Sequence, residues 1–230
     1  MIQNDISKKI IIALDYDNKE SVINLCDQLD PSYCRIKVGK QLFTKLGPSI
    51  IDVIHKKNFE IFLDLKFHDI PVTVYKACIE AYKLGIWMLN VHLLGGEEMI
   101  KAAKEARDKE NPSALIIGVS LLTSHSDASL EYLGLKNRVN AVKNLAKLAE
   151  KCSIDGIVCS PSDISVIKDS LSNLIYVTPG IRLNDDNDDH AQIYTPKKAL
   201  SLGSDYLVIG RPITDAKEPM EVVNKIISTI

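Results

Sequence analysis

The sequence lacks the marks of a membrane, secreted or nucleic-acid-binding protein. Its 230 residues contain no run of about 18 apolar residues, so no membrane-spanning helix is expected. With 28 basic and 30 acidic side chains the formal net charge is -2, which leaves no positive excess to hold a nucleic-acid polymer. The first residues show no signal-peptide pattern. We therefore expect a cytoplasmic protein with neither nucleic acid nor membrane as partner.

The usual metal and nucleophile motifs are missing too. The five cysteines are odd in number and form no C-x-x-C pair, which favours reduced thiols in the core (Cys26, Cys34, Cys78, Cys152 and Cys159). Neither H-E-x-x-H, nor a comparable metal spacing, nor a G-x-S-x-G elbow occurs. The motifs therefore indicate neither a dedicated metal site nor Ser/His/Asp catalysis.

What the chain does contain is a regular alternation of two patterns. Eight short apolar, β-branched runs predict strands at Ile10–Asp15, Cys34–Gly39, Phe59–Phe67, Trp87–Leu93, Leu115–Leu122, Gly156–Ser160, Leu174–Gly180 and Tyr206–Gly210. Helical spacing lies between them, at Ser21–Leu29, Pro48–Lys56, Val72–Leu84, Glu97–Asp108, Val139–Lys151, Ser162–Asp169, Pro196–Leu202 and Pro219–Ile227.

This alternation predicts an α/β fold with a parallel sheet. Strands that are apolar throughout are buried on both faces, and strict alternation implies right-handed crossovers. A doubly wound open sheet would alternate too, but it usually has fewer strands and often a Gly-rich first turn, which Leu14-Asp15-Tyr16-Asp17 is not. No linker or change of composition divides the chain. We expect residues 1–230 to form one (β/α)8 barrel, a TIM barrel.

The third predicted strand carries the strongest chemical signal. In Phe62-Leu63-Asp64-Leu65-Lys66-Phe67, side chains that alternate with period two place Asp64 and Lys66 on one face, toward the barrel interior. A buried ion pair that only holds the strand in place is the plain structural alternative. Adding Lys37 on the second strand and Asp69 beyond the third gives two cations and two anions at the catalytic rim. That arrangement favours a catalytic role.

The last two strands predict a phosphate site. Loops after the seventh and eighth strands of a barrel often bind phosphate, and Gly180, Arg182, Gly210 and Arg211 suit this role, although a tight turn is an equal alternative for Gly-Arg-Pro. The polar stretch from Asn184 to His190 would be a solvated loop or a mobile cover. His92, alone on an apolar strand, is expected to be a hydrogen-bonded core residue rather than a catalyst. Trp87 is expected to pack in the core.

The run Asp64-Leu65-Lys66-Phe67-His68-Asp69-Ile70-Pro71, with Thr73, resembles the signature of the orotidine 5′-phosphate decarboxylase family, bacterial type. Six further motifs lie in order along nearly the whole chain: Ala13-Leu14-Asp15, Lys37-Val38-Gly39, Val91-His92 with Gly95-Gly96, Leu122-Thr123-Ser124, Val177-Thr178-Pro179-Gly180-Ile181-Arg182 and Ile209-Gly210-Arg211-Pro212. The resemblance implies a carboxy-lyase that converts orotidine 5′-monophosphate to uridine 5′-monophosphate and CO2, the last step of de novo pyrimidine synthesis. It implies no metal and no organic cofactor.

The resemblance also implies roles for single residues. Lys66 would donate a proton within the network of Lys37, Asp64, Lys66 and Asp69. The resemblance further implies a homodimer with shared active sites, in which Asp69, Ile70 and Thr73 reach the partner's site. The substrate contacts that it implies are Asp15 and Lys37 for the ribose, Thr123 and Pro179 for the pyrimidine, and Arg182, Gly210 and Arg211 for the phosphate. Where the family has a glutamine in the seventh loop, this chain has His190, with Gln192 two residues later, and either could bridge phosphate and base.

Two other functions remain open on the sequence. A magnesium-dependent sugar-phosphate enzyme of the same superfamily, such as a hexulose-phosphate synthase, has a similar D-x-K-x-x-D core, although Asp69-Ile70-Pro71 and the flanking motifs favour the decarboxylase. A non-catalytic nucleotide-binding regulator would keep the phosphate residues but could dispense with Lys66. Retention of Lys66 argues against a regulator.

Overall fold

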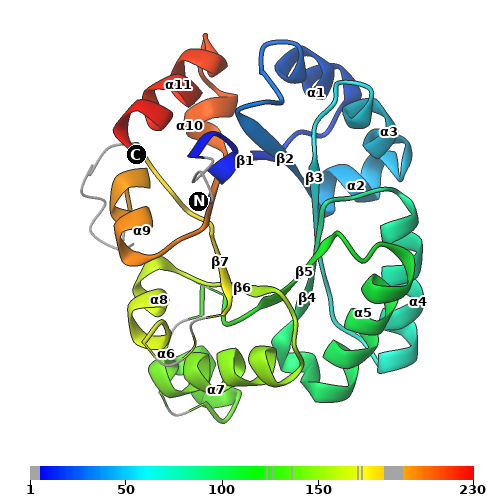
Figure 1. Ribbon diagram of the computed structural model, residues 1–230, viewed down its shortest axis with the longest axis vertical. Helices are drawn as coiled ribbons and strands as arrows, with labels where there is room; N and C mark the ends of the chain where they lie inside the picture. Colours follow the sequence, from blue (N-terminus) through cyan, green and yellow to red (C-terminus); the bar gives the residue numbers. More distant parts are fainter. Residues whose placement is uncertain are drawn as a thin grey trace.

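The computed structural model describes residues 6–122, 124–125, 127–135, 137–169, 171, 173–183 and 194–230. Eight parallel strands close into a barrel in sequence order, and β8 pairs with β1 (Figure 1). They are β1 (Ile10–Leu14), β2 (Cys34–Gly39), β3 (Ile61–Phe67), β4 (Met88–His92), β5 (Leu115–Val119), β6 (Gly156–Val158), β7 (Ile175–Thr178) and β8 (Tyr206–Ile209). The predicted (β/α)8 barrel is confirmed.

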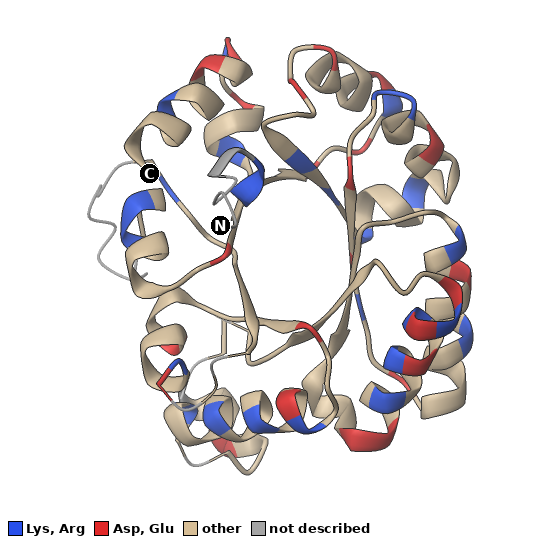
Figure 2. Ribbon diagram, viewed as in Figure 1, with Lys and Arg blue, Asp and Glu red and all other residues tan. Residues whose placement is uncertain are grey.

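Helices form a ring outside the barrel (Figure 1). Those that follow the predicted pattern are α1 (Lys19–Cys26), α3 (Ser49–His55), α4 (Pro71–Lys83), α5 (Gly96–Glu110), α7 (Arg138–Lys151), α8 (Pro161–Ile167), α9 (Pro196–Leu202) and α11 (Pro219–Thr229). None of the helices in the described ranges has both the length and the apolar character needed to cross a membrane. In the ribbon of Figure 2, basic and acidic positions are interspersed along α4 and α5.

Some short elements were not predicted. They are the helices α2 (Lys40–Leu46), α6 (Asp127–Tyr132) and α10 (Arg211–Thr214) and the 3-10 turns η1 (Ile6–Lys9) and η2 (Leu93–Gly95). Such short elements have too few residues to show a helical period, so packing against the barrel decides whether they form. The strand predicted at Leu115–Leu122 is also too long, because β5 ends at Val119 and the chain beyond it lines a pocket.

The barrel has two hydrophobic layers, as strands buried on both faces require. Alternate residues of β1 show the division, since Ile10 and Ile12 pack toward the helices while Ile11 and Ala13 point inward. The inner layer comprises Ile11, Ala13, Phe62, Met88, Ile117, Val177 and Val208. This filled interior leaves room for a site only at the end of the barrel, and all five cysteines are free and buried in the surrounding core.

An aromatic and ionic cluster fills the amino-terminal end of the barrel. The guanidinium of Arg35 lies 4.0 Å from the ring centroid of Trp87, and the Trp87 ring meets Tyr206 edge to face at 5.1 Å. Arg35 also pairs with Glu60 at 3.0 Å. Trp87 therefore packs as expected, and this cluster leaves the opposite, carboxyl-terminal end as the place for a site.

Candidate active site

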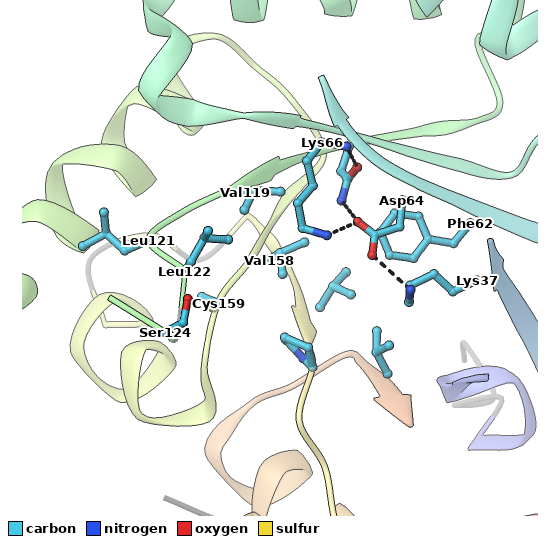
Figure 3. A pocket seen from close by; sticks show the side chains of 14 residues that line it. Lys37, Phe62, Asp64, Lys66, Val119, Leu121, Leu122, Ser124, Val158 and Cys159 are labelled. Atoms are coloured by element: carbon cyan, nitrogen blue, oxygen red, sulfur yellow. Dashed lines mark hydrogen bonds and ion pairs between the residues drawn. The ribbon is translucent and has the colours of Figure 1, made fainter. Parts of the chain in front are cut away.

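A pocket of about 210 Å³ opens among the carboxyl ends of the strands. Its lining comes from β2 to β8 and the segment after β5 (Figure 3). The lining residues are Lys37, Phe62, Asp64, Lys66, Asn90, Val119, Leu121, Leu122, Ser124, Val158, Cys159, Val177, Pro179 and Val208. Three charged groups thus share a chamber whose other walls are almost entirely apolar, and water-poor surroundings strengthen their interactions.

Asp64 is the centre of the charged group. Its Oδ2 lies 3.2 Å from Lys37 Nζ, and its Oδ1 lies 2.5 Å from Lys66 Nζ, so the two lysines approach the carboxylate from opposite sides (Figure 3). Asp64 and Lys37 are 9% and 8% exposed. A buried carboxylate is stable only when paired, and this one has a cation on each oxygen.

The pKa of Asp64 reflects these contacts. Burial alone would raise it, but the charges of Lys37 and Lys66 and the hydrogen bonds from Lys66 and Asn90 outweigh burial and lower the pKa below its ordinary value. Asp64 is therefore ionised at neutral pH. Two ammonium groups and one carboxylate give the cluster a net charge of +1, which suits an anionic ligand.

Lys66 reaches the pocket from an irregular stretch of β3. The pairing of β3 with β4 runs from Leu63 opposite Leu89 to Phe67 opposite Val91, so four residues of β3 span the same distance as two of β4. Within this bulge Lys66 has φ 52°, a left-handed conformation that few non-glycine residues adopt. Strict alternation was therefore the wrong reason for placing Lys66 beside Asp64, although the two side chains do meet.

Asp69, Ile70 and Thr73 lie outside this pocket in the single chain. The carboxylate of Asp69 accepts a hydrogen bond from the Ile70 backbone N–H at 2.6 Å, and no ion pair joins Asp69 to Lys66 within the described part of the chain. Asp69 and Ile70 border a shallow surface depression, and Thr73 is exposed on the first turn of α4. Of the four predicted network residues, three (Lys37, Asp64 and Lys66) meet within one chain, and Asp69 does not join them.

The residues expected to hold ribose and phosphate surround the mouth of the barrel. A Cβ added to Gly210 would lie 3.5 Å from Asp15 Oδ2, so the ends of β1 and β8 place Asp15 beside Gly210. Gly180 has φ 80°, and Pro179 just before it lines the pocket. Arg211 is exposed at the start of α10, and Arg182 is partly buried.

Three predicted contacts, Thr123, His190 and Gln192, lie outside the described residues. The neighbours of Thr123 on both sides, Leu122 and Ser124, line the pocket. Of the residues that flank His190 and Gln192 in the sequence, Arg182 donates its backbone N–H to the Tyr194 carbonyl at 3.1 Å.

His92 differs from its prediction. It is buried at the end of β4, but its Nδ1 has no hydrogen-bond partner among the described residues, and its ring stacks on His68 with centroids 5.3 Å apart. Burial, together with the nearby His68, His125, Lys40 and Lys66, lowers the pKa of His92 to about 4. It is therefore neutral at pH 7, as a packed ring.

Asn90 is a polar residue of the pocket that the sequence did not single out. It is fully buried and binds both Asp64 and the backbone of Lys66. The available signal is a polar amide in the apolar run from Trp87 to Leu93, two residues before His92. In the described part of the chain no three His, Cys, Asp or Glu side chains are grouped so that they could share a metal ion.

A closed parallel barrel with a lysine–aspartate–lysine cluster at the carboxyl ends of its strands defines the class, a (β/α)8-barrel enzyme. The family model described as "Orotidine 5'-phosphate decarboxylase / HUMPS family" matches residues 8–226, and the chain belongs to this family.

Curated relatives and a solved structure agree with this family. An orotidine 5′-phosphate decarboxylase of Saccharophagus degradans is 48% identical over 221 residues, 95% of this chain and 93% of the relative. One of Legionella pneumophila strain Lens is 46% identical over 225 residues, 95% and 97%. The crystal structure of the Lactobacillus acidophilus orotidine 5′-phosphate decarboxylase superposes with a TM-score of 0.85 at 36% identity, covering 96% of this chain and 98% of that one.

Proposed function

We propose that this protein is a cytoplasmic, homodimeric enzyme that decarboxylates orotidine 5′-monophosphate to uridine 5′-monophosphate and CO2 without metal or organic cofactor. The proposal rests on the position of Lys66, whose Nζ lies 2.5 Å from Asp64 Oδ1 in a pocket with apolar walls, in a chain of this family. The reaction is the last step of de novo pyrimidine synthesis.

Lys66 would act as the proton donor. When the bond between the ring carbon and the carboxylate breaks, CO2 leaves and the electron pair stays in an in-plane orbital that the π system cannot delocalise. An ammonium group beside that carbon stabilises the developing charge and then transfers a proton to it. The ring carbon becomes C–H, and the neutral amine regains its proton from water.

Asp64 and Lys37 would prepare the site for this step. The ionised Asp64 fixes Lys66 Nζ and would crowd the carboxylate of the substrate, which favours its departure as neutral CO2 with the negative charge left on the ring carbon. Lys37 balances Asp64 from the other side and would also contact the ribose with Asp15. The apolar wall of Val119, Val158 and Val177 would keep water from the carbanion.

The rest of the substrate would lie across the mouth of the barrel. Thr123 and Pro179 would border the pyrimidine, and Arg182, Gly210 and Arg211 would bind the phosphate. Either His190 or Gln192 would bridge phosphate and base. The phosphate would bind far from the reacting carbon, and its binding energy can still lower the barrier of the chemical step. A substrate lacking phosphate should therefore show a lower kcat as well as a higher KM, and an undiminished kcat would refute this role.

We place Asp69, Ile70 and Thr73 in the site of a second copy of the chain. Asp69 lies outside the pocket that holds Lys66 of its own chain, and the adjoining surface is apolar, with Ile70 62% and Val72 55% exposed. Exposed apolar side chains around a functional carboxylate are what a subunit interface would cover. In the dimer, Asp69 of the partner subunit would complete the charge network.

The test is an ultraviolet assay with orotidine 5′-monophosphate in the presence of a chelator. We expect turnover by the parent protein and a loss of at least about 1,000-fold in kcat for Lys66→Ala, since the general acid is removed. Lys101→Ala, an exposed surface lysine paired with Glu97, is the control and should retain parent activity. Turnover that a chelator abolishes, or equal activity in Lys66→Ala, would contradict the metal-free mechanism, and binding without turnover would favour the regulator.

A further inference from the structure

We infer that Asn90 is a positioning residue that holds Asp64 and Lys66 in their working geometry with the two ends of one side chain. The inference rests on the proposed function for its kinetic readout. The contacts on which it depends belong to the structure of the free protein and can be tested without turnover.

The two ends of the Asn90 amide make different bonds. Its Nδ2 donates to Asp64 Oδ1 at 2.6 Å, and its Oδ1 accepts from the backbone N–H of Lys66 at 2.8 Å. The direction of the amide is fixed by chemistry, because only the NH2 end can donate to an ionised carboxylate and only the carbonyl end can accept an N–H. Asn90 is 0% exposed, so water cannot replace either bond.

The bond to Lys66 supports an unusual piece of backbone. The bulge in β3 takes residues 64–66 out of the regular pairing with β4, and Lys66 adopts φ 52°. A buried backbone N–H that loses its strand partner must find another, and here the carbonyl of Asn90 supplies it. Asn90 itself lies in β4, between Leu89 and Val91, which are the last regular partners on either side of the bulge.

The bond to Asp64 restrains the side chain of Lys66, whereas the first bond restrains its backbone. Asp64 Oδ1 accepts from both Asn90 Nδ2 and Lys66 Nζ, so the Asn90 side chain, the Asp64 carboxylate and Lys66 form a closed ring of contacts. The charged groups that face Asp64 are Lys37 from β2 and Lys66 from β3, and Asn90 is its neutral donor from β4. Removing Asn90 should loosen Lys66 at its backbone and at its Nζ together.

Two variants of nearly unchanged shape separate the two bonds. Asn90→Asp keeps an acceptor for the Lys66 N–H but replaces the donor to Asp64 by a second carboxylate. Asn90→Leu removes both bonds and adds no charge. The matched control is Asn111→Asp, which makes the same chemical change at the end of α5, where the Asn111 side chain donates to the Ile86 carbonyl at 3.4 Å and accepts from Ser113 Oγ at 2.8 Å.

We expect kcat to fall about 10- to 100-fold in both variants, the range that loss of a hydrogen bond to a charged group implies, with a smaller change in KM. The acid limb of the kcat/KM profile should move to higher pH, and further in Asn90→Asp, because a neighbouring carboxylate disfavours ionisation of Asp64. Asn111→Asp should retain the parent profile. Parent-like kcat and an unmoved acid limb in both variants would overturn the inference.

Carbon-13 NMR titration of the labelled carboxylates gives a readout independent of activity. The midpoint of Asp64 should rise in both folded variants, and a structure of Asn90→Leu should show Lys66 leaving its positive φ. If the parent protein fails to decarboxylate the substrate, the proposed function is wrong while these two measurements still decide the role of Asn90. If neither variant folds, Asn90 is a structural core residue and the inference is wrong.

Discussion

Asp64 binds an ammonium group on each of its carboxylate oxygens, and this pairing makes its burial tolerable. Lys37 and Lys66 lie 3.2 and 2.5 Å from it. Replacing Asp64 by a neutral residue would leave two like charges in an enclosed pocket, so such a change would disturb the site beyond the loss of one group. This dependence is why the three residues are best regarded as one unit.

His92 should make the stability of the protein depend on pH. Its pKa is about 4 in the folded chain against an ordinary 6.5, because burial disfavours the charged ring. As pH falls from 6.5 to 4, His92 becomes protonated in the unfolded chain but stays neutral in the folded chain. The free energy of unfolding therefore decreases, by up to about 3 kcal/mol, and this contribution levels off below pH 4.

His92→Phe keeps an aromatic ring to stack on His68 but removes the titration. Urea unfolding at several pH values between 7 and 4 should therefore give a flatter stability curve for the variant than for the parent. Parallel curves for the two proteins would contradict this account of His92.

At the scale of single elements, β3 departs from regular geometry where the chemistry lies. Leu63 is buried in the outer layer and Phe67 packs partly against it, while the residues between them contain the bulge. The strand thus satisfies the core at both ends and still places Lys66 in the pocket. A regular strand would satisfy the core equally well but would not require an acceptor at Asn90.

Helix α8 offers a test of a local stabilising motif beside the pocket. Ser160 Oγ accepts from the Asp163 N–H at 3.2 Å, and Asp163 Oδ2 accepts from the Ser160 N–H at 3.2 Å, a reciprocal capping box. Ser160→Ala should lower the free energy of unfolding by about 1 kcal/mol in urea titrations. Ser165→Ala in the same helix removes only a bond to the Ser162 carbonyl and should leave stability almost unchanged. Equal losses in the two variants would contradict the capping role.

At the scale of the whole molecule, the proposed dimer predicts complementation between inactive chains. Lys66→Ala and Asp69→Ala should each be nearly inactive alone. Refolded together in equal amounts, they should recover about a quarter of parent activity, because half of the random dimers are mixed and each mixed dimer has one intact site. Activity is measured in the ultraviolet assay.

The control mixture is Lys66→Ala with Asp64→Ala, whose two altered residues belong to one chain's site. No mixed dimer of this pair contains an intact site, so no recovery is expected. Recovery in the control, or none in the test mixture, would show that Asp69 does not act across a subunit interface.

The sequence by itself determined the eight strands, most of the long helices and the residues of the charge cluster. These follow from local features: apolar runs such as Cys34–Gly39 predict a strand wherever they occur, and Asp64, Lys66 and Lys37 stand out because charges are costly in such runs. Strand ends were less well predicted, as at Val119 and Val158, because the closing of the barrel decides where pairing stops.

Only the tertiary structure decided the bulge at Lys66, the contacts of Asn90 and the separation of Asp69 from the pocket of its own chain. Each depends on the register between two strands about 25 residues apart, or on the direction of the chain after a strand. A local sequence pattern predicts neither of these. Side-chain period predicted that Asp64 and Lys66 would meet. The register between β3 and β4 set how they do so.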